Sequence, residues 1–328
     1  TGKGLKSGGK KGVSFQQGST KQNVLNTKTK ITSVPRLTDV KLACYNAFEE
    51  ANISELPEFV KISITDNTRK KFIYKIQNDA QLHNVTSIGY FSKVAVKQIP
   101  KGYGEPDLSE VNICRRLRHP SILMLFGCLI TDTDINIVTN YIKGMNLSYA
   151  VGLATSKKHQ PIDEKYNGFV IYHVAQGMAY LHERGVIHQD LKPANIIIEE
   201  GSYKPVICDF GISKLKDLVI TTNIGGSNAG TLAYQHIDQI HGERPTTAVD
   251  VYSFAVIIGE VYARVPAWRG KNYKEVRVAI EHGCYPTFPN IPQASQKIID
   301  DCFQPAKQRP AFTELLPELE LQSQLAVW

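Results

Sequence analysis

Residues 186–198 read VIHQDLKPANIII, and residues 206–211 read VICDFG. Both stretches place acidic side chains in loops beside short runs of Val and Ile. An Asp next to a transferred hydroxyl group can accept its proton. An Asn five residues later can join a second Asp in holding a divalent cation through hard oxygen ligands. Asp190, Asn195 and Asp209 therefore form the centre of a candidate site.

Two lysines and a glutamate accompany these acids. Lys97 lies on a predicted strand, KVAVKQI at 93–99, and Glu110 lies on the predicted helix that follows, where its carboxylate can hold the lysine in place. Lys192 follows Asp190 by two positions and can neutralise phosphate charge. Lysine, carboxylate and amide groups that converge between two lobes are what phosphoryl transfer requires, because its catalysis is mainly positioning and charge neutralisation.

The order of the predicted elements divides the chain into a strand-rich part and a helical part. Apolar patterns predict strands at 59–64, 72–76, 93–99, 123–129 and 135–141. They predict helices at 42–51, 108–117, 166–184, 248–262, 272–282, 294–303 and 311–323. This order predicts an α+β fold with a small β-rich N-lobe, a larger and mainly helical C-lobe, and a hinge around residues 140–144.

Six segments occur in an order that is typical of one family. They are VAVK (94–97), HQDLKPAN (188–195), DFG (209–211), GTLAY (230–234), DVYSFAVII (250–258) and QRP (308–310). With them, the chain resembles a eukaryotic protein kinase domain over about residues 70–324, which implies the bilobal protein-kinase-like fold. The sequences HPSILMLFG (119–127) and DVYSFAV most resemble those of the tyrosine-kinase-like group. This group includes mixed-lineage, receptor-interacting and mixed-lineage-kinase-domain-like proteins.

The resemblance implies a catalytic role for each residue at a matching position. Lys97 would contact the α- and β-phosphates of ATP and pair with Glu110. Asp190 would be the catalytic base, and Lys192 a phosphate contact. Asn195 and Asp209 would be the ligands of Mg²⁺.

The resemblance also implies a nucleotide pocket and two supporting residues. Thr139 would be the gatekeeper, and the hinge Asn140, Tyr141 and Ile142 would hold the adenine through its backbone. Ala95 and Ile197 would pack above and below the adenine ring, and Glu110 and Asp209 complete the predicted cofactor-binding set with Lys97. Asp250 would anchor the catalytic loop from a buried helix, and His188 is interpreted as a core histidine that supports the loop.

Two residues indicate the class of substrate. Lys192 and Thr231 match serine/threonine kinases, so the resemblance implies transfer of the ATP γ-phosphate to hydroxyl groups of a protein substrate. ATP and Mg²⁺ are the expected cofactors.

The nucleotide loop departs from the family pattern. The stretch before Lys97 lacks GxGxxG, reads QNDAQLHNVTSIGY at 77–90 and has its only glycine at Gly89. Side chains would hold this loop further from the phosphates, and Asp79 would bring negative charge towards them. Weak binding of ATP is therefore expected.

Three further departures concern the catalytic loop and the activation segment. Gln189 stands where most kinases have Arg, so phosphorylation of the activation loop (Ser213, Thr221, Thr222 and Ser227) would have a weaker means of ordering it. His236, Ile237 and Asp238 replace Ala-Pro-Glu, and Asp238 is expected to pair with Arg309. Cys208 is expected to line the nucleotide pocket.

Composition predicts how the rest of the chain is organised. The 328 residues carry a net charge of +7, and residues 1–30 hold seven lysines and no acid. Such a segment is predicted to be a basic, disordered tail or linker. The alternative is a segment that binds an anionic partner such as nucleic acid or a membrane surface. The predicted domains are 1–35, the tail; 36–70, an N-terminal extension; and 71–326, the kinase domain, with the N-lobe at 71–142 and the C-lobe at 143–326.

Other features bear on partners and compartment. The six cysteines lack CxxC spacing, which favours reduced thiols over a disulfide framework or a zinc site. Reduced thiols indicate a cytosolic or nuclear compartment, and a cytoplasmic location is expected. No apolar stretch is long enough to be a transmembrane segment, and no specific nucleic-acid partner is expected. The chain begins at Thr1 without Met, which predicts a fragment with further domains or signalling partners outside it.

Two hypotheses about activity remain open, with a distant third. The retained acids favour an active serine/threonine kinase. The missing glycines favour a pseudokinase that acts as a signalling switch or scaffold with weak or no catalysis. A small-molecule kinase of the same fold is less plausible, because GTLAY resembles a platform for peptide substrates.

Overall fold

The computed structural model describes residues 59–64, 71–76, 93–100, 109–130, 134–155, 160–210, 214–215 and 232–325. All of them belong to one compact unit, residues 35–328. The predicted tail, the predicted helix at 42–51 and the glycine-poor stretch at 77–90 lie outside the described residues.

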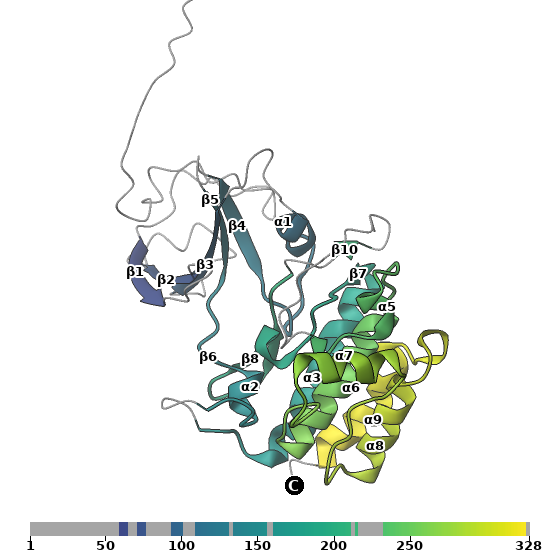
Figure 1. Cartoon of the computed structure of the whole chain (residues 1–328). Coiled ribbons are helices and arrows are strands. Elements are labelled where there is room, and N and C mark those ends of the chain that lie inside the picture. The colour runs from purple at the N-terminus through teal and green to yellow at the C-terminus, as the bar shows by residue number, and fades with distance from the viewer. Residues whose placement is uncertain are drawn as a thin grey trace, which may run out of the picture. The chain divides into compact units, whose positions relative to one another are not determined.

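The N-terminal part is an antiparallel sheet of five strands (Figure 1). The strand order is β1-β2-β3-β5-β4, with β1 at Phe59–Ile64, β2 at Lys71–Ile76, β3 at Lys93–Pro100, β4 at Leu125–Ile130 and β5 at Asp134–Asn140. All five strands were predicted, within about two residues at their ends. β1 lies in the segment predicted as an N-terminal extension and pairs with β2 along its whole length.

Helix α1, Ser109–Cys114, is shorter than the predicted helix at 108–117. After Cys114 the chain tightens into i→i+3 hydrogen bonds, from Arg116 N to Ile113 O and from Leu117 N to Cys114 O. The residue before a proline avoids the helical conformation, and Pro120 follows closely. The chain therefore leaves the helix gradually before the His119-Pro120 pair.

The C-terminal part is mainly helical and was predicted well where its helices are long. Its helices are α2 (Leu147–Ala150), α3 (Asn167–Glu183), α5 (Ile237–Ile240), α6 (Ala248–Ala263), α7 (Tyr273–Glu281), α8 (Gln293–Cys302) and α9 (Phe312–Leu325). Turns of 3₁₀-helix lie at Glu164–Tyr166, Pro193–Asn195 and Ala306–Gln308. As predicted, α3 ends before a glycine, Gly185, which has a left-handed φ of 70°.

Short strands, which the sequence analysis did not assign, frame the segments that were predicted to be catalytic. They are β6 (Gly144–Asn146), β7 (Val186–Ile187), β8 (Ile196–Glu199), β9 (Pro205–Ile207) and β10 (Lys214–Leu215). β6, β8 and β9 form one antiparallel sheet, and β7 pairs with β10. Strands of two to four residues are too short to show a hydrophobic period, so pattern analysis could not separate them from loops.

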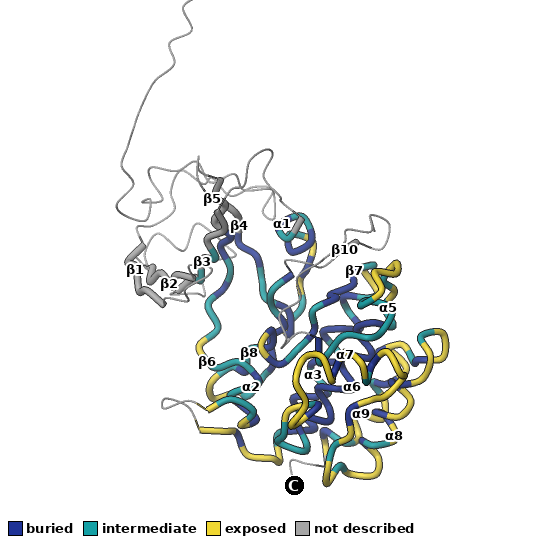
Figure 2. Tube along the Cα trace, in the orientation of Figure 1, coloured by how far each residue is buried: buried dark blue, intermediate teal, exposed yellow. Residues whose placement is uncertain are grey.

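Helix α6 forms the centre of the hydrophobic core (Figure 2). Every residue from 249 to 261 is buried, as its almost uniformly apolar sequence predicts. Glycines allow other elements to come close: a Cβ atom on Gly259 would lie 2.2 Å from the ring of Phe288. On Gly168 of α3 it would lie 2.8 Å from the carbonyl oxygen of Gln322 on α9.

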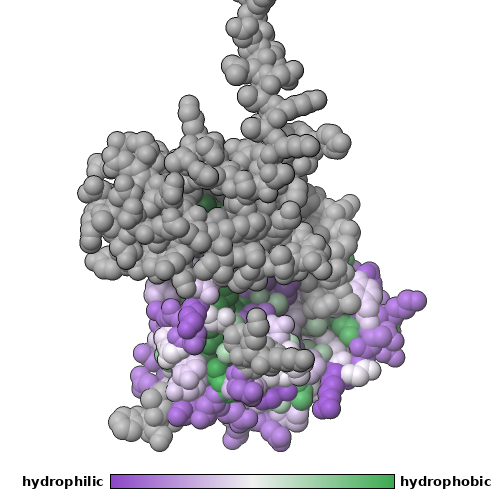
Figure 3. Space-filling view, turned by 90° about the vertical axis from the view of Figure 1, so that its left-hand side faces the viewer, coloured by the Kyte–Doolittle hydropathy of each residue, from purple (hydrophilic) through white to green (hydrophobic). Residues whose placement is uncertain are grey.

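Hydrophilic residues predominate on the described surface in Figure 3, with smaller hydrophobic areas among them. The large hydrophobic side chains that are exposed in the described part are Tyr273, Val278, Tyr285 and Leu321. None of the helices in the described ranges is long and apolar enough to span a membrane.

Candidate active site

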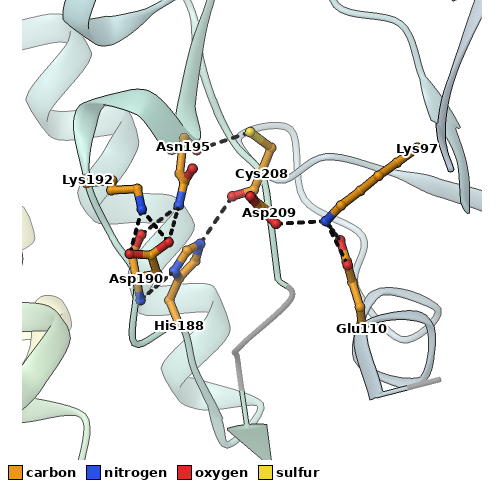
Figure 4. Close-up of polar contacts among 8 residues, drawn as sticks. All are labelled: Lys97, Glu110, His188, Asp190, Lys192, Asn195, Cys208 and Asp209. Carbon is orange, nitrogen blue, oxygen red and sulfur yellow. Dashed lines mark hydrogen bonds and ion pairs between the residues drawn. The ribbon is translucent and has the colours of Figure 1, made fainter. Parts of the chain in front are cut away.

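Lys97, Glu110 and Asp209 form a charged cluster that joins three elements (Figure 4). Lys97 Nζ on β3 lies 2.9 Å and 2.8 Å from the two carboxylate oxygens of Glu110 on α1. It also lies 2.8 Å from Oδ1 of Asp209, two residues after β9. The sequence predicted the contact with Glu110. It did not predict the hydrogen bond to Asp209, because 112 residues separate Asp209 from Lys97 and a local sequence pattern does not extend that far.

The two carboxylates keep the Lys97 ammonium charged. Burial alone lowers the pKa of Lys97, but the charges and hydrogen bonds of Glu110 and Asp209 more than offset this, so the pKa is raised. A lysine fixed in this way presents a permanent positive charge at a point where an anionic group can bind.

A second cluster surrounds Asp190 (Figure 4). Lys192 Nζ lies 2.8 Å and 2.6 Å from the two carboxylate oxygens of Asp190. Asn195, at the end of the 3₁₀ turn, donates from Nδ2 to the main-chain oxygen of Asp190 at 2.8 Å and to its Oδ2 at 3.0 Å. The carboxylate is thus oriented from two sides, and the three residues predicted as catalytic lie together.

Asp250 holds the main chain immediately before Asp190. It is fully buried in the first turn of α6. Its Oδ2 accepts hydrogen bonds from the N–H of His188 and from His182 Nε2, both at 2.8 Å, and its Oδ1 accepts one from the N–H of Gln189 at 2.8 Å. The predicted anchor from the buried helix is confirmed.

His188 has the buried, hydrogen-bonded environment that its interpretation as a core histidine requires. Its Nδ1 accepts a hydrogen bond from the N–H of Asp190 at 3.3 Å, so the proton lies on Nε2, which donates to the carbonyl of Cys208 at 3.3 Å. The ring also packs against Phe210, with 5.3 Å between the centroids. His188 therefore links the Asp190 loop to the segment that contains Asp209.

The residues predicted to surround the adenine lie on β3, β5, β8 and the segment after β5. Ala95 pairs with Thr139 across β3 and β5. Asn140 is buried: its N–H donates to the carbonyl of Met124, and its Oδ1 accepts from the N–H of Met124 at 2.9 Å. Tyr141 and Ile142 follow it half-buried, as is Ile197 on β8. Their contacts with a nucleotide stay predictions.

Cys208 lies between the two clusters, and its thiol donates to the carbonyl of Asn195 at 3.3 Å. The thiol is half-buried. Its predicted position in a nucleotide pocket stays a prediction.

A carboxylate on α6, Glu260, was missed by the sequence analysis. It is 1% exposed and accepts hydrogen bonds from the hydroxyl of Tyr234 at 2.8 Å and from the N–H of Ala267 at 2.7 Å. Burial raises the pKa of the Glu260 carboxyl to about 7, although these hydrogen bonds lower it. The available signal was an acid late in the otherwise apolar sequence of α6, ten residues after Asp250. Glu260 ties the GTLAY segment to the core.

The prediction of an ion pair between Asp238 and Arg309 is wrong: the described structure does not contain this pair. Asp238 Oδ2 lies 3.1 Å from Nδ1 of His236 instead. The guanidinium of Arg309 donates to the carbonyls of Gln304 and Ala248, and among the described residues its Nη2 has no hydrogen-bond partner. Asp is one methylene shorter than the Glu of the family pattern, so its carboxylate reaches less far.

The residues predicted from the activation loop, Ser213, Thr221, Thr222, Ser227 and Thr231, lie outside the described residues, as does Asp79.

Comparisons with known proteins identify the family of the chain. The family model described as protein kinase domain matches residues 80–318. Serine/threonine-protein kinase CTR1 of Arabidopsis thaliana is 34% identical over 215 residues, 64% of this chain and 26% of that protein. A probable serine/threonine-protein kinase of Dictyostelium discoideum is 33% identical over 236 residues, 69% of this chain and 25% of that protein.

A human relative is similar over a shorter stretch. Receptor-interacting serine/threonine-protein kinase 1 of Homo sapiens is 31% identical over 175 residues, 49% of this chain and 25% of that protein. The chain spans about a quarter of the length of these relatives.

Proposed function

The chain belongs to the protein kinase domain family, and from this membership we propose that it is a serine/threonine protein kinase that transfers the γ-phosphate of ATP to hydroxyl groups of proteins. The observation that carries the proposal is the contact of Lys97 with both Glu110 and Asp209. The family needs the pair of this lysine with this glutamate for transfer, together with the Asp of the DFG segment as a ligand of Mg²⁺. A signalling switch without catalysis is not favoured, because the relatives named above are serine/threonine kinases.

Asp190 is the proposed general base. Its carboxylate would accept the proton of the attacking hydroxyl group as the bond to the γ-phosphorus forms. Lys192, now paired with Asp190, would contact the phosphate that is transferred and offset its charge. Lys97 would hold the α- and β-phosphates, because its charge is retained by its two carboxylate partners.

Asn195 and Asp209 fit a Mg²⁺ ion by the chemistry of their donors. The Nδ2 group of Asn195 is used by Asp190, which leaves its Oδ1 as the atom for a cation. Mg²⁺ is commonly held by one or two side chains together with phosphate oxygens. Among the described residues, no group of three His, Cys, Asp or Glu side chains could hold a metal ion. When bound, the ion neutralises charge on the phosphates.

The nucleotide pocket would be completed by the hinge. In this proposal the backbone of Asn140, Tyr141 and Ile142 holds the adenine, Thr139 limits the depth of the pocket, and the ring lies between Ala95 and Ile197. The pairing of Ala95 with Thr139 supports this arrangement, because it brings two of these residues together on neighbouring strands.

Three finer assignments also belong to the proposal. The chain is assigned to the tyrosine-kinase-like group, with support from the similarity to CTR1 and to receptor-interacting kinase 1. Its domains are a tail at 1–35, an extension at 36–70 that contributes β1 to the sheet, and a kinase domain at 71–326 divided at residue 142. A cytoplasmic location is supported by the free thiols of Cys114, Cys208, Cys284 and Cys302.

The test is phosphate transfer from radiolabelled ATP to the protein itself and to a generic basic protein substrate, with Mg²⁺ and separately with Mn²⁺. The wild-type chain is compared with Asp190→Asn, which keeps the size of the side chain and removes the base. Label on Ser and Thr that falls at least 100-fold in the variant is expected, in line with the range for a lost general base. No label from a folded wild-type protein, or label on Tyr alone, would overturn the proposal.

A further inference from the structure

The two peptide groups before Asp190 are held by different parts of the molecule. The N–H of Gln189 donates to Oδ1 of Asp250 at 2.8 Å, which fixes the peptide group between His188 and Gln189. In the next peptide group, the N–H of Asp190 donates to His188 Nδ1 at 3.3 Å. The carbonyl of that same group, belonging to Gln189, accepts a hydrogen bond from Nε2 of Gln239 at 3.1 Å.

Gln239 reaches this carbonyl from α5, the short helix that follows the GTLAY segment. Its side chain makes two hydrogen bonds with opposite polarity. The Oε1 atom accepts from the N–H of His236 at 3.3 Å, which completes a capping box at the start of α5. The Nε2 group donates to Gln189. One amide thus caps its own helix and contacts the catalytic loop.

The conformation of Gln189 explains why such a contact matters. Gln189 has a left-handed φ of 65°, which is uncommon for a residue with a side chain, and it is 8% exposed. A conformation of this kind persists only where the surroundings hold it. If the peptide group after Gln189 rotated, the Cα of Asp190 and its carboxylate would turn with it.

We propose that Gln239 is a positioning residue for phosphoryl transfer: its amide fixes the peptide group that joins Gln189 to Asp190 and thereby sets the direction of the Asp190 carboxylate. The catalytic part of this inference rests on the proposed function. Gln239 does not contact the reacting atoms. It ties the end of the activation segment to the catalytic loop through a neutral hydrogen bond, which needs no phosphate group.

Two substitutions separate the two hydrogen bonds of Gln239. In Gln239→Glu the carboxylate still accepts from the N–H of His236, so the cap of α5 is kept, but the donor to Gln189 is lost. In Gln239→Lys the ammonium can donate to Gln189, but the acceptor of the cap is lost. Gln293→Glu makes the same chemical change as Gln239→Glu at an exposed position at the start of α8, and is the matched control.

The first readout is amide hydrogen exchange of the full chain, followed by mass spectrometry of the peptide that contains residues 188–190. A lost hydrogen bond of ordinary strength predicts about 3- to 10-fold faster exchange in Gln239→Glu. Gln239→Lys and Gln293→Glu are expected to stay within about twofold of the wild type. Equal exchange in Gln239→Glu and the wild type, or exchange that follows the melting temperature of the variants, would overturn the inference.

The second readout is steady-state kinetics of phosphate transfer. Gln239→Glu is expected to lower kcat about 3- to 10-fold and to leave the KM for ATP within about twofold, because Lys97 and Glu110 are untouched. Gln239→Lys should recover most of the lost kcat even where its melting temperature is lower. If the role of Gln239 is purely structural, kcat should fall in proportion to the loss of melting temperature, so that Gln239→Lys is impaired more than Gln239→Glu.

The two proposals can fail separately. A folded wild-type chain that transfers no phosphate overturns the proposed function. The hydrogen-exchange rates of the variants, compared with the wild type, then still decide whether Gln239 fixes the loop. Transfer by the wild type with unchanged kcat in Gln239→Glu overturns the positioning role alone.

Discussion

Glu260 shows how one side chain can make stability depend on pH. The carboxyl is buried between Tyr234 and Ala267, and burial raises its pKa to about 7 from an ordinary value near 4.5. In the unfolded chain the group loses its proton at a lower pH. Between about pH 4.5 and 7 the folded state therefore binds more protons than the unfolded state. The contribution of Glu260 to the unfolding free energy thus falls as the pH rises.

Glu260→Gln should remove this dependence. Its amide can accept from Ala267 and donate to Tyr234, so the contacts are retained without a titrating group. From pH 4.5 to 8 the wild type should lose roughly 2–3 kcal/mol of unfolding free energy relative to the variant, as measured by urea denaturation at each pH. Parallel curves for the two proteins would show that Glu260 does not titrate in this range.

Asp238 and Arg309 offer a stabilising substitution. Burial lowers the pKa of the Arg309 guanidinium while the charge of Asp238 raises it, so the two groups already interact at a distance. Asp238→Glu adds the methylene that the family pattern has and should let the carboxylate reach Nη2 of Arg309. The expected gain is about 1 kcal/mol of unfolding free energy, measured by urea denaturation.

The control for this substitution is Asp238→Asn, which removes the charge without lengthening the side chain and should not stabilise the protein. A variant Asp238→Glu that is no more stable than the wild type would contradict the proposed geometry.

At the scale of elements, α6 and the catalytic loop depend on one carboxylate. Asp250 accepts hydrogen bonds from two buried main-chain N–H groups and from one histidine N–H group. An asparagine would place its own N–H group against at least one of these donors, and that hydrogen bond would be lost. Asp250→Asn should therefore lower the unfolding free energy by about 2–4 kcal/mol, measured by urea denaturation. Asp301→Asn, at an exposed position on α8, is the matched control. Equal effects of the two substitutions would argue against the anchor.

The predictability of the elements follows from their length and from how local their contacts are. The sequence of α6 predicts a buried central helix because its apolar residues continue around the helix. The strands β7 to β10 contain two to four residues and are defined by their pairing with other segments of the chain. The same reason explains why the Gln239 contact escaped prediction, since 50 residues separate it from Gln189.

The candidate site was predictable in a different way. Lys97, Asp190 and Asp209 were identified by motifs whose order matches a family, and the structure brings Lys97 to Asp209. The failed ion pair of Asp238 marks the limit of this approach. A motif gives the position of a charge, but the described structure places the Asp238 carboxylate beside His236, a neighbour that is absent from the family pattern.

At the scale of the whole molecule, ligand binding should be visible as a change in stability. A ligand that binds only the folded state stabilises it by mass action, and 100 times the Kd corresponds to about 2.7 kcal/mol. ATP with Mg²⁺ should raise the melting temperature of the wild type more than ATP alone. Millimolar nucleotide is expected to be needed, because the glycine loop of the family is missing.

Asp209→Asn should keep the shift that ATP alone causes and lose the additional shift from Mg²⁺, because the variant keeps the size of the side chain and loses its charge. Thermal unfolding of both proteins with and without Mg²⁺ measures this. A shift from Mg²⁺ that is the same in both proteins would place the ion elsewhere.

The close approach of Gly168 to Gln322 also has a consequence for how the protein is made. Helix α3 packs against α9 although on the order of 150 residues separate them, so this contact has a high contact order and a large loop-closure entropy. During translation, the apolar face of α3 leaves the ribosome long before its partner is synthesised. Nascent chains that stop before residue 312 should therefore remain sensitive to protease and bind chaperones, and protection should arise only when α9 has emerged.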